Sequence, residues 1–128
     1  MYMSKLSIFL IVMLTMLFSC GKKEANISVK YIGNEVYGNV DVCIALANGE
    51  ATNFVRLIEL DILEIERITP SIAEQIFVFT VPIEKSYTPF IFQDLNSNNS
   101  FELDEPVRIG LPIVFLEDDV ETKITYNY

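Results

Sequence analysis

Residues 75–81 read Gln75-Ile76-Phe77-Val78-Phe79-Thr80-Val81, and this is the most strand-like run in the chain. Every residue after Gln75 is β-branched or aromatic, and such side chains pack well on the pleated, half-buried surface of a sheet. Pro82 then starts a turn that extends to Lys85, because proline cannot donate a hydrogen bond to a sheet ladder. A second apolar run, from Tyr87 to Gln93, follows this turn. The segment therefore predicts two β-strands joined by a short turn.

Shorter runs of the same kind lie on both sides of this segment. Further strands are predicted over residues 27–31, 40–46, 113–116 and 120–126. Asn48-Gly49 and the acidic residues 117–119 fall between these runs, and both stretches favour turns. With residues 54–68 included, about seven short strands alternate with turns. This spacing indicates an all-β fold, a single antiparallel β-sandwich.

Residues 54–68 fit two kinds of element. Ile58, Leu60 and Ile62 alternate with acidic residues as in a strand, but the alternation slips at Leu63, which requires a bulge or a bend. The apolar residues of the same stretch also gather on one side of a helix. Their enrichment in β-branched types favours the strand, and the helix stays open as the alternative.

The first twenty residues have the organisation of a secretory signal peptide. Lys5 supplies a short positive start, and residues 6–18 are almost all apolar. That run is shorter than the roughly 20 apolar residues that a membrane-spanning helix needs. It ends in Leu17-Phe18-Ser19-Cys20, which resembles the lipobox of bacterial lipoproteins, with Leu three positions before the cysteine and a small residue next to it. The resemblance implies a signal peptide over residues 1–19 and a lipid on the thiol of Cys20.

Cleavage at this point removes 19 of the 128 residues and leaves 109. We expect a polar, lipidated tether over residues 20–26 and one domain over residues 27–128. Two or more acyl chains hold a protein stably on a membrane. Gly21 lacks the acidic side chain that retains some lipoproteins at the inner membrane, so the resemblance favours the outer membrane of the cell envelope.

Composition excludes several function classes from the prediction. Without Lys5 the chain has 8 of its 9 basic side chains against 18 acidic ones, a formal charge of −10, which repels nucleic acid and anionic headgroups. The chain has no histidine and no glycine-rich phosphate loop, so we predict that it is not an enzyme. Cys43 lies between Val42 and Ile44 and is expected to be a buried core residue, since no histidine is present to act as its base.

Residues 94–105 carry recognisable chemistry. Oxygen-bearing side chains at every second position match the twelve-residue calcium loop of EF-hand proteins. The candidate ligands are Asp94, Asn96, Asn98, the backbone carbonyl of Ser100, Glu102 and Glu105. Phe101 fills the apolar position of that loop, and Asn99 stands where glycine is usual. Because asparagine adopts positive φ with little strain, this substitution is compatible with the turn.

Calcium is the predicted cofactor of this loop. It takes six to eight hard oxygen ligands at about 2.3–2.6 Å, whereas magnesium demands a tighter octahedron and keeps its waters. Because Asn96 and Asn98 are neutral, we expect weak binding, with a Kd on the order of 10⁻⁵ to 10⁻³ M. The alternative is a polar turn without a metal, since Asn, Ser and Asp favour turns by themselves.

The surroundings of the loop differ from those of an EF-hand. A strand precedes it, and Pro106 and Pro112 oppose a helix after it, so we expect the loop between strands. The Val81-Pro82 turn, the strand that opens at Tyr87 and the Asp-x-Asn-x-Asn loop closed by Glu105-Pro106 resemble a pattern in secreted bacterial proteins. Those proteins have transthyretin-like or carboxypeptidase-regulatory-like β-sandwiches. The resemblance covers about residues 77–117 and implies a fold and a metal rather than an activity.

Together these observations predict a non-enzymatic lipoprotein of the cell envelope whose β-sandwich binds one calcium ion structurally. The alternative is a surface adhesin or an accessory module that binds a glycan or a protein. That function requires an exposed aromatic patch beside the loop. No motif in the sequence specifies a protein or glycan partner.

Overall fold

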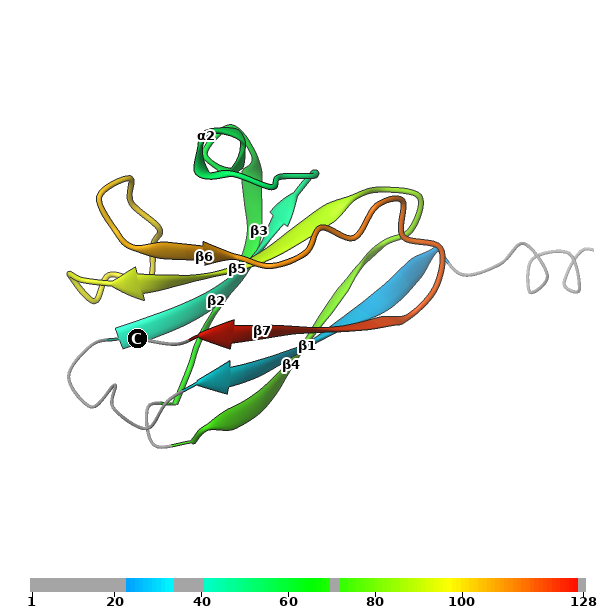
Figure 1. The fold of residues 1–128 in the computed structure, drawn as a ribbon. Coiled ribbons are helices and arrows are strands. Elements are labelled where there is room, and N and C mark those ends of the chain that lie inside the picture. The colour runs from blue at the N-terminus through cyan, green and yellow to red at the C-terminus, as the bar shows by residue number, and fades with distance from the viewer. Residues whose placement is uncertain (1–22, 34–40, 70–71, 127–128) are drawn as a thin grey trace, which may run out of the picture.

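The strand-like run over residues 75–81 forms most of β4 (Glu74–Pro82), and the run after the turn forms β5 (Tyr87–Asp94). The computed structural model describes residues 23–33, 41–69 and 72–126, which fold into two facing sheets (Figure 1). One sheet has the order β4-β1-β7, with β1 (Glu24–Gly33) in the middle and β7 (Val120–Tyr126) at one edge. The other has the order β3-β2-β5-β6, and its further strands are β2 (Asp41–Asn48), β3 (Asp61–Arg67) and β6 (Val107–Ile109). The predicted all-β sandwich of about seven strands is confirmed.

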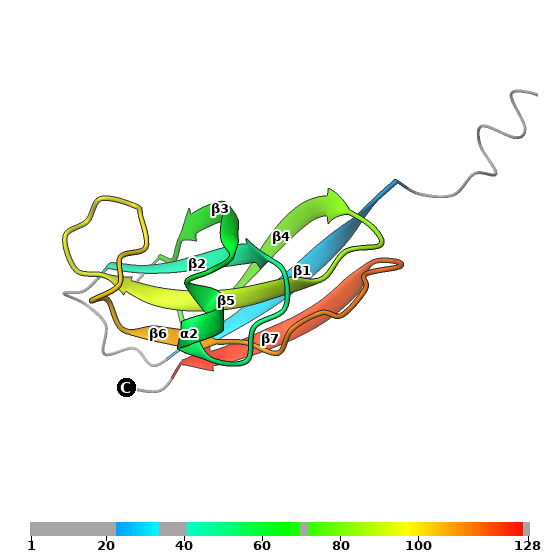
Figure 2. The same ribbon diagram turned by 90° about the horizontal axis from the view of Figure 1, so that it is seen from above.

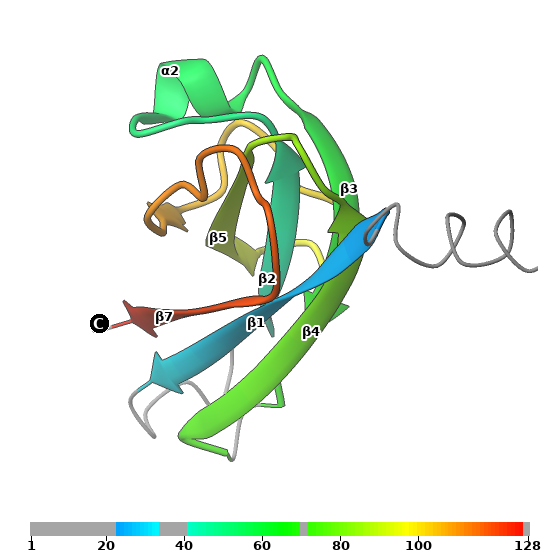
Figure 3. The same ribbon diagram turned by 90° about the vertical axis from the view of Figure 1, so that its right-hand side faces the viewer.

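Alternating side chains build the core between the two layers, which Figure 2 and Figure 3 show from above and from one end. In β4, Phe79 and Val81 are buried, whereas Ile76 and Val78 face solvent. β5 is buried along its whole length, because it is central in its sheet and covered on both faces. Burying a large apolar side chain stabilises the fold by about 1.5–3 kcal/mol.

A second, smaller core covers the outer face of the four-stranded sheet. Phe90 and Phe92 of β5 pack there with Cys43 and the alanines of β2, beneath Leu57 of the short helix α2 (Phe54–Leu57). Phe101, from the loop after β5, packs against the same cluster. Cys43 is fully buried, as the sequence predicts. This core fixes the β5–β6 loop against the sheet.

Residues 54–68 contain both of the elements that their sequence allows. Asn53 caps α2, because its side-chain oxygen accepts a hydrogen bond from the backbone N–H of Arg56 at 2.9 Å. The chain then enters β3, whose pairing with β2 shifts between Leu46 and Ala47, so that Leu63 is left without a partner. The bulge expected at Leu63 is therefore confirmed, while the single strand over 54–68 is wrong.

One strand pair departs from the predicted antiparallel arrangement. β1 pairs with β4 antiparallel but with β7 parallel, with Ile27 opposite Val120. The reason is the path of the chain after β6. Residues 110–119 run back along the sandwich to the end at which β1 begins (Figure 1), so β7 enters the sheet in the same direction as β1.

The strand predicted over residues 113–116 is wrong. Only Ile113 makes an isolated bridge, with Tyr87, and Phe115 has φ of 52°, which lies outside the strand region. β6, which the sequence analysis did not identify, takes the place of this strand next to β5. Its three residues directly follow the candidate calcium loop and Pro106.

The domain also begins earlier than predicted. β1 starts at Glu24, and Ala25 is buried, so residues 24–26 belong to the sheet rather than to the tether. The predicted signal peptide and Cys20 lie outside the described residues. Within the part of the chain that the structure describes, no helix is long and apolar enough to cross a membrane.

Candidate functional site

The predicted calcium loop connects two paired strands at one end of the sandwich. β5 and β6 are antiparallel neighbours, with Phe92 opposite Val107, and the backbone N–H of Gln93 donates to the carbonyl of Pro106 at 2.9 Å. This pairing brings the two ends of the loop together. Asp94 at its start and Glu105 at its end are nearly inaccessible, with exposed fractions of 1% and 4%. The expectation that strands rather than helices flank the loop is confirmed.

The two buried carboxylates close the loop through backbone amides. Asp94 Oδ1 accepts from the N–H of Asn98 at 3.2 Å, and its Oδ2 accepts from the N–H of Asn99 at 2.8 Å. Glu105 reaches the other side of the loop, where Oε2 accepts from Leu95 N–H at 2.8 Å and Oε1 from Glu102 N–H at 2.7 Å. Each buried charge is therefore compensated by two amide dipoles.

The third carboxylate, Glu102, accepts hydrogen bonds from two asparagine side chains. Its Oε1 accepts from the Asn96 amide at 2.7 Å and also from the Asn98 amide. The Oδ1 atom of Asn98 accepts in turn from the backbone N–H of Ser100 at 3.0 Å. All six predicted ligand residues thus belong to one hydrogen-bonded network, which Ser100 enters through its backbone N–H.

The chemistry of this network fits a hard cation once two side-chain amides turn over. Asn96 and Asn98 direct N–H groups at Glu102, and turning each amide over would present oxygen instead, with no change in size. Each carboxylate oxygen of Asp94 and Glu105 has a second lone pair beyond the one that meets an amide. No three His, Cys, Asp or Glu side chains among the described residues form a metal-binding group by themselves. A cation here would therefore depend on the neutral oxygens of the loop as well as on its carboxylates.

Backbone conformation at the turn agrees with the sequence prediction. Asn99 has φ of 59°, the left-handed conformation that asparagine tolerates better than most residues. Ser97 is also left-handed, with φ of 56°, which no pattern in the sequence indicates. The two left-handed residues allow the chain to reverse around the Asp94 carboxylate.

Arg67 is a member of the site that sequence reasoning missed. From the end of β3 its guanidinium approaches Asp41 Oδ2 at 2.8 Å and Asp94 Oδ2 at 3.5 Å, and its Nε donates to Asn99 Oδ1 at 3.2 Å. Arg67 and Asp41 are distant in sequence and reach the loop only through strand pairing, because Cys43 lies opposite Arg67 and Asp41 lies opposite Asp94. The guanidinium lowers the affinity of the loop for a second cation through charge repulsion.

Asp41 ties the β2 strand to the loop. Its Oδ2 accepts a hydrogen bond from the Ser97 hydroxyl. That hydrogen bond, followed by the one from Arg67, lowers the pKa of the Asp41 carboxyl below its ordinary value of 3.8. Asp41 therefore remains ionised near neutral pH and holds both the loop and the guanidinium.

Phe101 anchors the loop in the second core. Its ring centroid lies 5.3 Å from those of Phe90 and Phe92 and 6.3 Å from that of Phe54, in tilted and edge-on arrangements. Such aromatic pairs add about 0.5–1.5 kcal/mol beyond their buried area. The apolar position of the predicted loop is therefore occupied as the sequence indicates.

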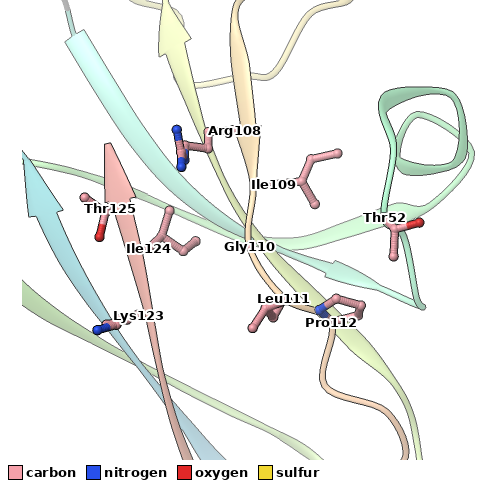
Figure 4. A pocket seen from close by; sticks show the side chains of 9 residues that line it. All are labelled: Thr52, Arg108, Ile109, Gly110, Leu111, Pro112, Lys123, Ile124 and Thr125. Atoms are coloured by element: carbon pink, nitrogen blue, oxygen red, sulfur yellow. The ribbon is translucent and has the colours of Figure 1, made fainter. Parts of the chain in front are cut away.

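Two other features carry little chemistry. Burial and then the negative charge of Asp94 raise the pKa of the Cys43 thiol to about 11, which keeps it protonated and unreactive near neutral pH. A shallow groove of about 350 Å³ lies between β6 and β7 (Figure 4). Arg108 and Lys123 contribute to its lining, which includes no carboxylate and no thiol. The groove therefore offers no acid–base pair.

Comparison with known proteins adds no family to this description, since the chain matches no family model, no curated protein and no solved structure. The geometry of the loop and the fold around it therefore carry the functional interpretation. The resemblances to bacterial lipoproteins and to transthyretin-like sandwiches stay predictions.

Proposed function

We propose that the protein is a lipid-anchored β-sandwich of the bacterial cell envelope whose β5–β6 loop binds one calcium ion structurally. The observation that supports calcium binding is the single hydrogen-bonded network that joins all six residues chosen as ligands from spacing alone. The anchoring part rests on the lipobox-like sequence that ends at Cys20.

Calcium in this loop would act on stability rather than on a substrate. Asp94, Glu102 and Glu105 would supply charged oxygens, Asn96 and Asn98 would supply amide oxygens, and Ser100 its carbonyl. The ion would neutralise carboxylates that amide N–H groups and the Arg67 guanidinium now compensate. Because the loop joins β5 to β6 and carries Phe101, its order also fixes the second core.

Arg67 sets the strength of the proposed site. A guanidinium 3.5 Å from the Asp94 carboxylate already supplies part of the positive charge that the loop needs. The affinity therefore belongs in the weak range for calcium loops, with a Kd on the order of 10⁻⁵ to 10⁻³ M. Such a site fills only where calcium is plentiful, as outside the cytoplasm.

Thermal unfolding tests the proposal. The chain from residue 21 onward contains every described strand and can be melted with calcium or with a chelator. At a hundredfold excess over Kd, calcium stabilises the folded state by roughly 2.7 kcal/mol, which raises the melting temperature by roughly 10 °C for a domain of this size. We expect Glu105→Gln to lose this increase. Glu121→Gln, an exposed carboxylate on β7, serves as the control and should keep it.

An unchanged melting temperature at about 0.1 M calcium, a hundredfold excess over the weakest expected Kd, would argue against the calcium site. The alternative of an adhesin or a glycan-binding module finds no support at this loop. Phe101 is the only aromatic residue of the loop, and it packs against three other phenylalanines rather than facing solvent as a stacking platform.

A further inference from the structure

We propose that Val114 and Phe115, here called the apolar tip, contact the membrane surface to which the protein is anchored. This inference rests on the proposed lipid anchor at Cys20. It adds a second attachment, made by the folded domain itself, and it sets the orientation of the sandwich on the bilayer.

The apolar tip faces solvent. Val114 and Phe115 have exposed fractions of 61% and 53%. Ile113 before them packs against the main core and Leu116 after them is buried in it, so the chain exposes these two apolar side chains between two inward-facing ones. Grouped apolar side chains on a protein surface mark sites that bind membranes or other proteins.

Hydrogen bonds place the tip at the end of the sandwich where the tether enters. The carbonyl of Lys23 accepts from the N–H of Ile83 at 3.1 Å, and Glu84 N–H donates to the carbonyl of Leu116. The N–H of Phe115 donates to the Ser86 hydroxyl oxygen at 3.0 Å. Figure 1 and Figure 2 both show residues 110–119 reaching the end at which β1 begins, opposite the end that carries the calcium loop.

Short covalent reach makes the lipid surface the partner of this tip. Cys20 precedes Lys23 by three residues, and three extended residues span at most about 11 Å. The lipid chains on Cys20 therefore hold this end of the domain within about that distance of the bilayer. An apolar side chain exposed at this end therefore lies within reach of the membrane interface.

Hydrogen bonds hold Phe115 of the tip in a strained backbone conformation. Phe115 has φ of 52°, a conformation that a bulky side chain rarely adopts. Its own N–H bond to Ser86 and the pair of bonds between Leu116 and the 84–85 backbone hold it there. Strained residues of this kind concentrate where a side chain must be presented for a function.

Nearby charge defines the kind of membrane. Residues 117–119 are Glu-Asp-Asp, and Glu84 lies at the same end together with Lys23 and Lys85. Four acidic and two basic side chains leave this end negative, which disfavours an anionic surface. The tip is therefore matched to the interface of a zwitterionic leaflet, where apolar side chains enter and the acidic run remains in water.

A tryptophan reporter tests this contact, because the chain contains no tryptophan of its own. The lipidated protein carrying Phe115→Trp is reconstituted into phosphatidylcholine vesicles with and without brominated acyl chains. Val114→Trp is a second reporter, in case the strained position does not accept indole. Ile76→Trp is the matched control, because Ile76 is 68% exposed on β4 and lies towards the opposite end of the sandwich.

We expect the emission of both tip reporters to shift to shorter wavelength and to be quenched by the brominated lipid, while the Ile76→Trp emission stays that of a water-exposed indole. Water-like, unquenched emission from both tip reporters in protein that sediments with the vesicles would overturn the inference and leave the lipid anchor intact. Failure of the Cys20-containing protein to sediment better than Cys20→Ser would remove the anchor, and the inference with it. A lipid-independent shift that grows with protein concentration would assign the tip to a second copy of the chain.

Discussion

Both ends of the sandwich contain residues with positive φ, but their side chains point in opposite directions. At the calcium-loop end, Ser97 and Asn99 adopt positive φ, and the turn directs carboxylates and amides inward onto one another. At the tether end, Glu84 and Phe115 adopt positive φ, and the turn directs an apolar side chain outward. Asparagine accepts this conformation readily, whereas a phenylalanine is strained by about 1–2 kcal/mol. Left-handed residues therefore close the loop at one end and expose the tip at the other.

Removing the Asp94 carboxylate has the largest expected effect on this comparison. Asp94→Ala leaves the N–H groups of Asn98 and Asn99 and one side of Arg67 without their buried acceptor. We expect the free energy of unfolding to fall by about 3 kcal/mol even in chelator, as measured by urea denaturation. Asp104→Ala, an exposed carboxylate in the same loop, is the control and should change it by less than about 0.5 kcal/mol. Equal effects from the two variants would mean that the hydrogen bonds of Asp94 do not hold the loop closed.

Glycine substitution compares the two left-handed turns directly. Phe115→Gly removes the strain of a half-exposed residue and is expected to stabilise the domain by about 1 kcal/mol in thermal or urea unfolding. Asn99→Gly should give no such gain, because asparagine is little strained and its side chain accepts from Arg67. A destabilised Phe115→Gly variant would show that the Phe115 side chain packs for stability rather than for presentation.

Comparison of the predicted and observed strands shows which features of the fold could be predicted from the sequence. β4 and β7 follow from local alternation, and the bulge at Leu63 follows from one slip in that alternation. The strand predicted over 113–116 fails because apolar composition does not reveal a left-handed Phe115, which hydrogen bonds to the distant turn over residues 84–86 impose.

The loop shows the same division between local and distant information. Its candidate ligand residues, its apolar Phe101 and the positive φ of Asn99 could be predicted from spacing within twelve residues. Arg67 and Asp41 join only because β2 lies between β3 and β5, and no local pattern reports that pairing. A single sequence therefore locates the loop but not the Arg67 guanidinium that lies beside it.

A smaller effect is expected from acid. Because the pKa of Asp41 is lowered in the folded state, its contribution to stability is present above its ordinary value of 3.8 and is lost as the pH falls through the lower folded value. The urea midpoint of the wild type should therefore fall more steeply than that of Asp41→Asn as the pH decreases below 3.8. Salt should reduce the difference between the two pH profiles, because the Arg67–Asp41 ion pair is partly exposed. Parallel pH profiles for the two proteins would exclude Asp41 as a support of the loop end.

Calcium titration of residues 21–128, followed by native mass spectrometry and by calorimetry, tests the central claim most directly. We predict one calcium per chain with a Kd on the order of 10⁻⁵ to 10⁻³ M, unchanged in Glu121→Gln and abolished in Glu105→Gln. Tighter binding in Arg67→Gln would identify the guanidinium as the competing cation. A chain that carries no calcium at millimolar concentration, in the wild type and in Arg67→Gln alike, would contradict the account.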